Sequence, residues 1–234
     1  DMLKITSKIN FIQIDGNSKY KYIHDDSHNT TLMYAAMKGH MTLVEQLLAR
    51  RITVNEKNDD GNTALMYAAD YGHTDIVKAL LAKEGIDVNV ANKHGDTALI
   101  DAAANGHTDI VNALLAKGAK VNDINTKENS ALMLAAWKGS KDTVKALLAV
   151  EGIKVNAANM YGGTALILAW TRGHKDTVNL LIANGANRYW REFLAPASCA
   201  FVFLGVFILS IFNFNFVFLC FYIYFFVNSI FFFL

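Results

Sequence analysis

The side chains of this 234-residue chain best suited to metal binding or acid–base catalysis are its seven histidines and the adjacent carboxylates Asp59 and Asp60. Zinc sites and proton-transfer sites need such groups to converge with partners at a defined spacing. His24, His28 and His94 have no partner at such a spacing, and Asp59-Asp60 lies on the tip of an expected turn. The sequence contains no phosphate-binding loop, nucleophile elbow or zinc-protease motif. We therefore expect no catalytic residue, no metal ligand and no cofactor.

The other histidines belong to a recurring dipeptide, which indicates an internal repeat. In one copy serine takes the place of histidine: Gly39-His40, Gly72-His73, Gly106-His107, Gly139-Ser140 and Gly173-His174. A threonine or serine two residues before a leucine recurs at spacings of 33, 34, 33 and 34 residues: Thr30, Thr63, Thr97, Ser130 and Thr164. Leu-Leu pairs form a third anchor, and we align Leu180-Leu181 as its fifth member. We expect each histidine ring to hydrogen-bond the adjoining backbone turn.

One unit shows how each repeat is expected to fold. Asp60-Gly61-Asn62 has the composition of a turn, Thr63 can cap a short helix, and Gly72 can end that helix. A second helix over about residues 74–83 presents one apolar face, formed by Ile76, Val77, Leu80 and Leu81. An extended hairpin arm follows from Val88. No such unit can bury its own apolar face, so the units must stack, and the one-residue insertions of repeats two and four fall harmlessly in a loop.

These anchors resemble the ankyrin repeat family, whose pattern contains a turn glycine, the motif T-P-L-H-x-A, then Gly-His and Leu-Leu. The resemblance recurs five times over about residues 30–190. It implies an all-α solenoid of helix–turn–helix units with hairpin arms. We place the five repeats at about residues 30–62, 63–96, 97–129, 130–163 and 164–190.

The departures from the family pattern are regular. Alanine or threonine stands at the motif's proline position in every repeat, and methionine or isoleucine stands at its histidine position: Met33, Met66, Ile100, Met133 and Ile167. We expect apolar packing between neighbouring first helices to replace the polar bonds of that histidine. Repeat one has Arg51 where the other repeats have glycine, and its turn carries His28 instead of glycine, which is expected of a capping repeat.

The resemblance also implies where a partner protein binds, namely the hairpin tips and the concave side of the first helices. Carried over position by position, the candidate binding residues are Asp59, Asp60, Asn62, Asp70, Tyr71, Lys93, His94, Asp96, Asn105, Lys127, Trp137, Lys138, Met160, Tyr161 and Arg172. Binding hot spots are enriched in Trp, Tyr and Arg, which favours Tyr71, Trp137 and Tyr161. We expect Trp170, at an alanine position of repeat five, to pack against whatever closes that end of the stack. The expected function is non-catalytic protein–protein binding.

Charge, cysteine content and the first residues bound the remaining possibilities. A net charge of +1 argues against a nucleic-acid partner. Both cysteines follow residue 192, so the repeats can hold neither a disulfide nor a cysteine-rich zinc site. Residues 1–29 do not complete a repeat and are predicted to form a strand–turn–strand extension over the first repeat, without a signal-peptide pattern.

The last 42 residues, 193–234, carry no charge, and 34 of them are apolar. About 20 apolar residues span a bilayer, so one or two transmembrane helices fit this length, with two spans at 193–212 and 216–234. Arg188 and Arg191 precede the run, which favours a membrane location with the repeats in the cytoplasm. Two alternatives stay open: a soluble cytoplasmic scaffold whose phenylalanine-rich tail is a translation or gene-assembly artefact, and a regulatory fragment of a larger channel or enzyme.

Overall fold

The computed structural model describes residues 27–50 and 52–187. The predicted strand–turn–strand of residues 1–29 lies almost wholly outside the described residues, as do Arg51 and the apolar tail 193–234, so these predictions stay predictions. Within the described ranges, no helix is both long and apolar enough to cross a membrane.

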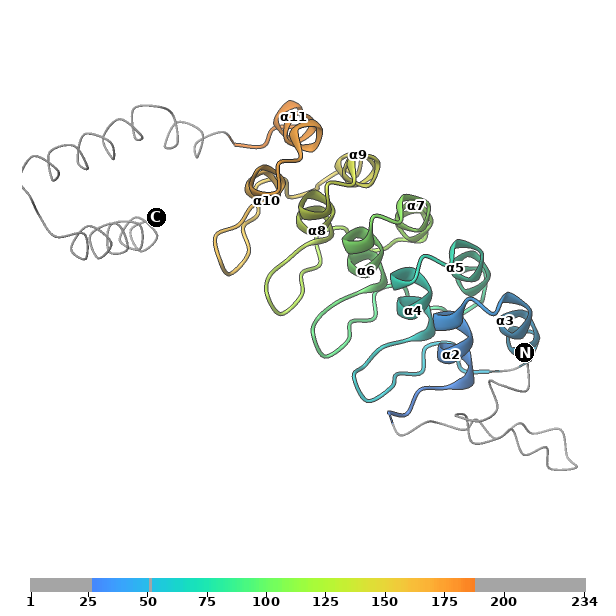
Figure 1. Cartoon of the computed structure of the whole chain (residues 1–234). Helices are drawn as coiled ribbons and strands as arrows, with labels where there is room; N and C mark the ends of the chain where they lie inside the picture. Colours follow the sequence, from blue (N-terminus) through green and yellow to red (C-terminus); the bar gives the residue numbers. More distant parts are fainter. Residues whose placement is uncertain (1–26, 51, 188–234) are drawn as a thin grey trace, which may run out of the picture. The chain divides into compact units, whose positions relative to one another are not determined.

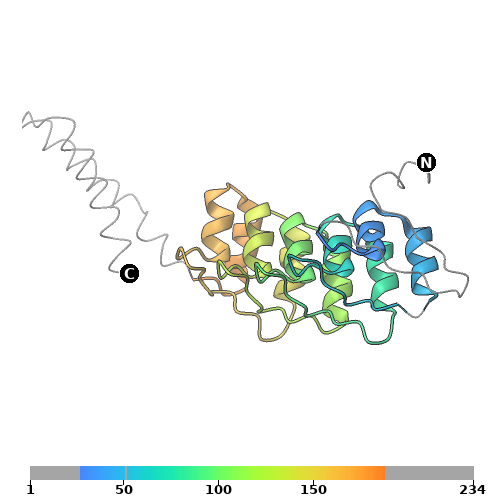
Figure 2. The same cartoon turned by 90° about the horizontal axis from the view of Figure 1, so that it is seen from below.

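The described chain is a stack of five helix pairs, shown from two directions in Figures 1 and 2. The first helix of each repeat lies on the side of the stack that carries the long hairpins, and the second helix lies behind it (Figure 1). The pairs are α2 (Thr31–Lys38) with α3 (Met41–Leu48), α4 (Ala64–Asp70) with α5 (Thr74–Leu81), α6 (Ala98–Asn105) with α7 (Thr108–Ala116), α8 (Ala131–Lys138) with α9 (Lys141–Leu148), and α10 (Ala165–Thr171) with α11 (Lys175–Ala183). The predicted all-α repeat solenoid is confirmed.

Each first helix begins where the threonine or serine anchor predicts. The Thr63 hydroxyl accepts a hydrogen bond from the Met66 amide at 3.3 Å, and the other four anchors cap their helices in the same way. This bond satisfies one of the amide groups that a helix start leaves without an intrahelical acceptor. The second helix α5 ends at Leu81, two residues before the predicted end, because the Lys83 amide bonds the Leu80 carbonyl in a tighter turn.

The core lies between successive repeats. In the first four repeats, five residues of each first helix face it, and the alanines at the fifth and sixth positions, such as Ala68 and Ala69, are fully buried so that neighbouring first helices approach closely. In repeat five, three residues of α10 are buried and Trp170 stands at the sixth position. The methionines at the family's histidine position are buried as predicted, and the Met66 sulfur also accepts the Thr63 amide at 3.4 Å. Ile167 is partly exposed because no described repeat covers repeat five. Trp170 is 46% exposed, and whatever closes that end lies outside the described residues.

The alignment of the Leu-Leu anchor was wrong in repeat five. Leu181, and not Leu180, is fully buried at the place that Leu147 and Leu114 occupy in the preceding repeats. Each of these leucines lies seven residues after the second residue of its glycine anchor, and Leu181 lies seven residues after His174 in the same way. The helix phase therefore assigns Leu181-Ile182 as the fifth pair.

The anchor histidines join repeats instead of closing their own turn. The Nε2 atom of His107 lies 3.1 Å from the Asp70 carbonyl oxygen, and His73 and His174 reach the Met37 and Trp137 carbonyls in the same way. The expected bond to the backbone exists, but its acceptor lies in the last turn of the first helix of the preceding repeat. The ring sits over the glycine there: a Cβ on Gly72 would lie 2.6 Å from His107 Cε1.

The hairpin arms are joined by a ladder of asparagine side chains. Asn92 Oδ1 accepts the His94 and Asp96 amides of its own tip, while Asn92 Nδ2 donates to Asn62 Oδ1 of the preceding tip at 2.8 Å. The same three bonds recur at Asn58, Asn125 and Asn159. The arms were predicted to be extended hairpins, but in the described residues they form turns with two isolated bridges, Ile124 with Ser130 and Ala158 with Thr164.

A second series of asparagine side chains joins each repeat to the loop that follows the second helix of the next repeat. Asn55 Nδ2 donates to the Gly85 carbonyl at 2.7 Å, and Asn55 Oδ1 accepts the Asp87 amide at 3.0 Å. Asn89 and Asn122 make the same pair of contacts with the loop of the next repeat. Because these contacts are counted from the loop glycine, the extra residue of repeats two and four, which precedes that glycine, leaves the register intact.

Candidate protein-binding face

The first helices leave three of their positions uncovered by the stack. We number positions from the first residue of each first helix. In every repeat positions four, seven and eight are partly or fully exposed, while positions one, two and five are buried. Because residues three or four apart share a helix side, these positions form one surface. We call it the recognition face: Tyr34, Met37, Lys38, Tyr67, Asp70, Tyr71, Asp101, Ala104, Asn105, Leu134, Trp137, Lys138, Leu168, Thr171 and Arg172.

An aromatic–cationic pair dominates the face at repeats four and five. Trp137 is 43% exposed, and the Arg172 guanidinium lies over its ring at 4.1 Å from the centroid. A guanidinium at this distance is attracted to the negative face of the indole ring, which fixes both side chains in one arrangement. Lys138 is exposed beside them. The structure therefore brings together three of the predicted binding residues.

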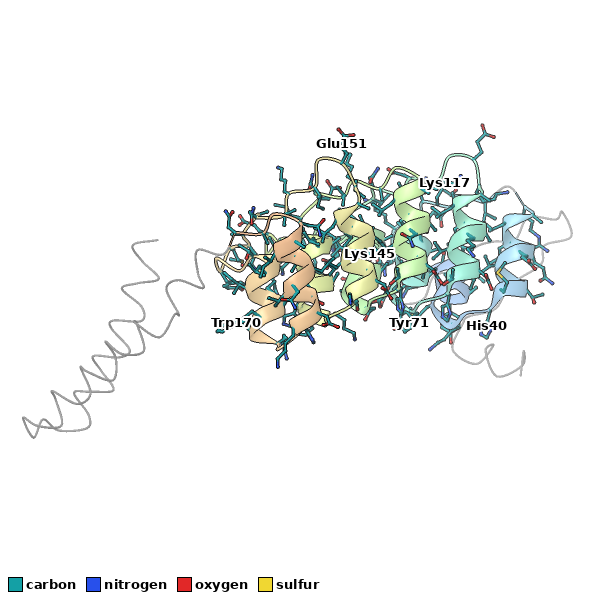
Figure 3. The ribbon with its side chains drawn as sticks, turned by 90° about the horizontal axis from the view of Figure 1, so that it is seen from above. His40, Tyr71, Lys117, Lys145, Glu151 and Trp170 are labelled. Carbon is teal, nitrogen blue, oxygen red and sulfur yellow. The ribbon has the colours of Figure 1, made fainter. Side chains whose placement is uncertain are left out.

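Tyr71 is the exposed aromatic residue of the face at repeat two. Its side chain is 54% exposed, and its ring stacks parallel to His73 at a centroid distance of 6.4 Å. Figure 3 shows Tyr71 at the edge of the stack where the first helices end, opposite Lys117 and Glu151 on the loops after the second helices. Stacking on a histidine that is itself bonded to the preceding repeat limits the motion of the Tyr71 ring.

Three carboxylates gather near the middle of the face. Asp101 stands on α6, Asp70 ends α4, and Asp96 lies on the adjoining hairpin. Burial, and to a smaller extent the charges of Asp96 and Asp70, together raise the pKa of Asp101 to about 8. Asn105 donates to Asp70 Oδ1 at 2.7 Å, and Asn125 donates to Asp96 Oδ1 at 2.8 Å.

The hairpin tips carry the other predicted binding residues. Met160 and Tyr161 are 57% and 65% exposed at the tip of repeat five. The side chains of Asp60, Lys93, His94 and Lys127 are exposed as well, while their backbones link successive tips, as in the 2.8 Å bond from the Lys93 amide to the Asp60 carbonyl. Asp59 lies 3.0 Å from His28 Nδ1, so part of its bonding capacity is used between repeats one and two.

Some predicted binding residues already have bonds within the stack. Asn62 and Asp96 each accept an asparagine of the next hairpin, and Asn105 bridges Asp70 and the Asp101 carbonyl. These side chains hold neighbouring repeats in register, so a partner meets them in fixed positions. Within the described residues, five other predicted binding residues make no such side-chain bond: Asp60, Tyr71, Lys138, Met160 and Tyr161.

Sequence reasoning missed Asp101 as a member of this surface. The signal was visible in the sequence, because the fourth helix position holds an aromatic or aliphatic residue in each of the other four repeats: Tyr34, Tyr67, Leu134 and Leu168. A carboxylate at such a position is desolvated by its neighbours, which is why its pKa departs from the ordinary range. Within the described ranges, no group of three or more His, Cys, Asp or Glu side chains is arranged to hold a metal ion.

Comparison with known families agrees with the repeat geometry. A family model of ankyrin repeats, three copies in length, matches residues 10–92, 32–127 and 99–189. The chain belongs to the ankyrin repeat family. Ankyrin repeats are protein–protein interaction modules, and this general role applies to the present chain. No curated protein matched the chain.

Proposed function

We propose that this ankyrin repeat protein is a non-catalytic binding module that holds another protein on its recognition face and hairpin tips. One observation carries the proposal: the stack leaves the same three positions of each first helix open, and these positions bear different chemistry from repeat to repeat. Trp137 and Tyr71 stand exposed on this face, and Tyr161 stands exposed on a hairpin tip, all on backbones fixed by inter-repeat bonds. Rigid aromatic side chains lose little conformational entropy when a partner covers them, which is why they serve as anchors.

The test removes two anchors and compares the proteins captured. Full-length chain with Tyr71→Ala and Trp137→Ala is expressed beside wild-type chain, and bound proteins are quantified by mass spectrometry after crosslinking in cells. Lys78→Ala with Lys145→Ala is the matched control, because both lysines are exposed on second helices, where Figure 3 shows Lys145. We expect the aromatic variant to lose partners that the lysine variant retains. Equal partner sets from the two variants would overturn the proposal.

We further propose that residues 193–234 anchor the module in a membrane with the repeats on the cytoplasmic side. The support is the charge-free apolar sequence preceded by Arg188 and Arg191. Alkaline carbonate extraction of cells expressing the full chain tests this. Retention in the membrane pellet is expected, and release into the supernatant together with peripheral proteins would contradict it.

A further inference from the structure

The centre of the recognition face is acidic and lacks a positive partner within the described residues. Asp101 accepts no hydrogen bond on its carboxylate there, and neither Asp70 nor Asp96 lies within ion-pair distance of a lysine or arginine. The ion pairs of the described ranges join His28 to Asp59 and Lys141 to Asp176, both away from this centre. Three neighbouring carboxyl groups without a cation repel one another when they ionise, and a positive group from outside the stack would relieve this repulsion.

One repeat further along, the same face becomes apolar and positive. Trp137 on α8 is 43% exposed under the Arg172 guanidinium, with Lys138 beside it. The first helices α6 and α8 contact each other directly, so the acidic centre and the indole ring belong to one continuous surface. This surface therefore offers two adjoining environments of different chemistry.

We propose that the partner presents an extended segment whose lysine or arginine enters the Asp70–Asp96–Asp101 centre while an apolar side chain about three residues away covers Trp137. This inference rests on the proposed function and names the chemistry of its partner. Charge complementarity identifies the basic residue, and the exposed indole identifies the apolar one. The Arg172 and Lys138 charges beside Trp137 disfavour a second basic residue at that end.

The spacing follows from helix geometry. Adjacent packed helices lie about 8–10 Å apart, and Asp101 and Trp137 differ by three positions, which adds roughly 4.5 Å along the helix axis. The two environments are therefore about 10 Å apart. A segment in the extended polyproline II conformation rises about 3.1 Å per residue with three residues per turn, so side chains three residues apart lie on one face, about 9 Å apart, and reach both.

The raised pKa of Asp101 supports this arrangement. Two of its three causes are the charges of Asp96 and Asp70, and a bound cation would oppose both. Binding of the basic side chain favours the ionised form of Asp101, so the complex releases a proton. The remaining cause, burial, is already present in the free protein.

The first experiment selects ligands without assuming a sequence. Full-length chain, immobilised through an N-terminal tag, is panned against a phage library of random ten-residue peptides, and the bound pool is sequenced. We expect enriched peptides to pair a lysine or arginine with an aliphatic or aromatic residue two to four positions away. Enriched peptides without a basic residue, or no enrichment at all, would overturn the inference about the extended segment.

The second experiment assigns each half of the motif to its place on the protein. The best peptide and its norleucine analogue, in which the basic residue is replaced, are titrated by fluorescence anisotropy. Asp70→Asn with Asp101→Asn should weaken the parent peptide at least tenfold and leave the analogue unchanged. Trp137→Ala should weaken both peptides while preserving their ratio.

A charge-matched control separates local from general electrostatics. Asp109→Asn with Asp142→Asn removes two exposed carboxylates from second helices, and it should leave both titrations unchanged. Equal loss in this control would overturn the assignment to the acidic centre. If capture of the cellular partners depends on Tyr71 and Trp137 but peptide affinity is unchanged by the Asp70 and Asp101 substitutions, the proposed function stands and this inference fails. If neither capture of the partners nor peptide affinity depends on the aromatic residues, both fail.

Discussion

The side chains between repeats and the side chains of the recognition face come from the same helices but follow opposite rules. Between repeats, three kinds of contact recur, each with its own constant geometry. A histidine contacts the backbone of the preceding repeat, an asparagine contacts the preceding hairpin, and fully buried alanines pack between the first helices. On the recognition face, no residue type occurs at the same position in more than two repeats. The distinction is physical, since the first set is covered by a neighbouring repeat and the second contacts solvent.

This difference teaches where stability and specificity reside. In a stack each repeat contacts only its neighbours, so stability is approximately the sum of repeat and interface terms. A change in the repeated contacts should therefore lower stability without a direct effect on binding. A change on the recognition face should do the reverse. The four predictions below test this division, beginning with the largest expected loss of stability.

The strongest test compares two glycines with the same backbone and different neighbours. Gly72 and Gly173 both have a left-handed φ, +78° and +76°, but only Gly72 lies under a histidine ring of a following described repeat. Gly72→Ala should combine about 1–2 kcal/mol of backbone strain with about 1–3 kcal/mol of overpacking against His107. Gly173→Ala should show the backbone strain alone. Urea unfolding followed by circular dichroism measures both variants.

The glycine comparison also checks the histidine contact itself. His107→Ala in the Gly72→Ala background should recover the overpacking part of the loss, because the clashing ring is gone. Equal losses for Gly72→Ala and Gly173→Ala would show that the ring adds nothing to the interface.

The next largest effect concerns the hairpin ladder. Asn92→Ala removes two bonds within its tip and one to Asn62, and it leaves their partners unsatisfied at a partly buried site. At roughly 1 kcal/mol for each bond, a loss of about 2–3 kcal/mol is expected. The adjacent Lys93→Ala changes an exposed side chain and should stay within about 0.5 kcal/mol of wild type. A small loss in the free energy of unfolding for both variants would show that the asparagine ladder contributes little to stability.

Much of the fold could be predicted because its signals are local. The capping threonines, the Gly-His turns and the apolar face of each second helix depend on neighbours within one unit, and all appear as predicted. The acceptors of the histidine rings could not be found this way, because they lie in the preceding repeat. The misaligned Leu180-Leu181 pair shows the same limit, since two similar residues are distinguished only by the phase of the helix.

The recognition face was predicted less completely than the fold. Trp137, Tyr71 and Arg172 were found by family position and residue type, and the structure places them exposed on one surface. Asn62 and Asp96 also carry inter-repeat bonds, which a single sequence does not reveal because those bonds join side chains about 30 residues apart. Asp101 was missed because its unusual pKa arises from burial and from two carboxylates on other elements.

A third prediction concerns Asp101, which lies on the recognition face but is poorly solvated. Its pKa rises from 3.8 to about 8 on folding, so the folded state holds a proton that the unfolded state releases between these values. The contribution of Asp101 to stability is therefore lost as pH rises from about 4 to about 8. Asp101→Asn removes this penalty, and it should match wild type near pH 4 and exceed it by at least about 2 kcal/mol at pH 9, because each tenfold change in proton affinity corresponds to about 1.4 kcal/mol.

Urea unfolding at pH 4, 7 and 9 measures this difference. Asp109→Asn, an exposed carboxylate on α7, provides a control that should follow wild type at each pH. A constant offset between Asp101→Asn and wild type across the series would contradict the titration and assign the effect to packing.

The smallest expected change in stability belongs to Trp137→Ala. The side chain is 43% exposed and its described contact is the Arg172 guanidinium, so its removal should cost at most about 1 kcal/mol. Binding of a partner should nevertheless fall at least tenfold, because a rigid anchor is lost while the backbone stays in place. Urea unfolding and isothermal titration with a captured partner measure the two quantities on the same sample. A stability loss as large as that of Asn92→Ala would place Trp137 among the residues that hold the stack together. The division between a repeated interior and a variable face would then fail at its most prominent residue.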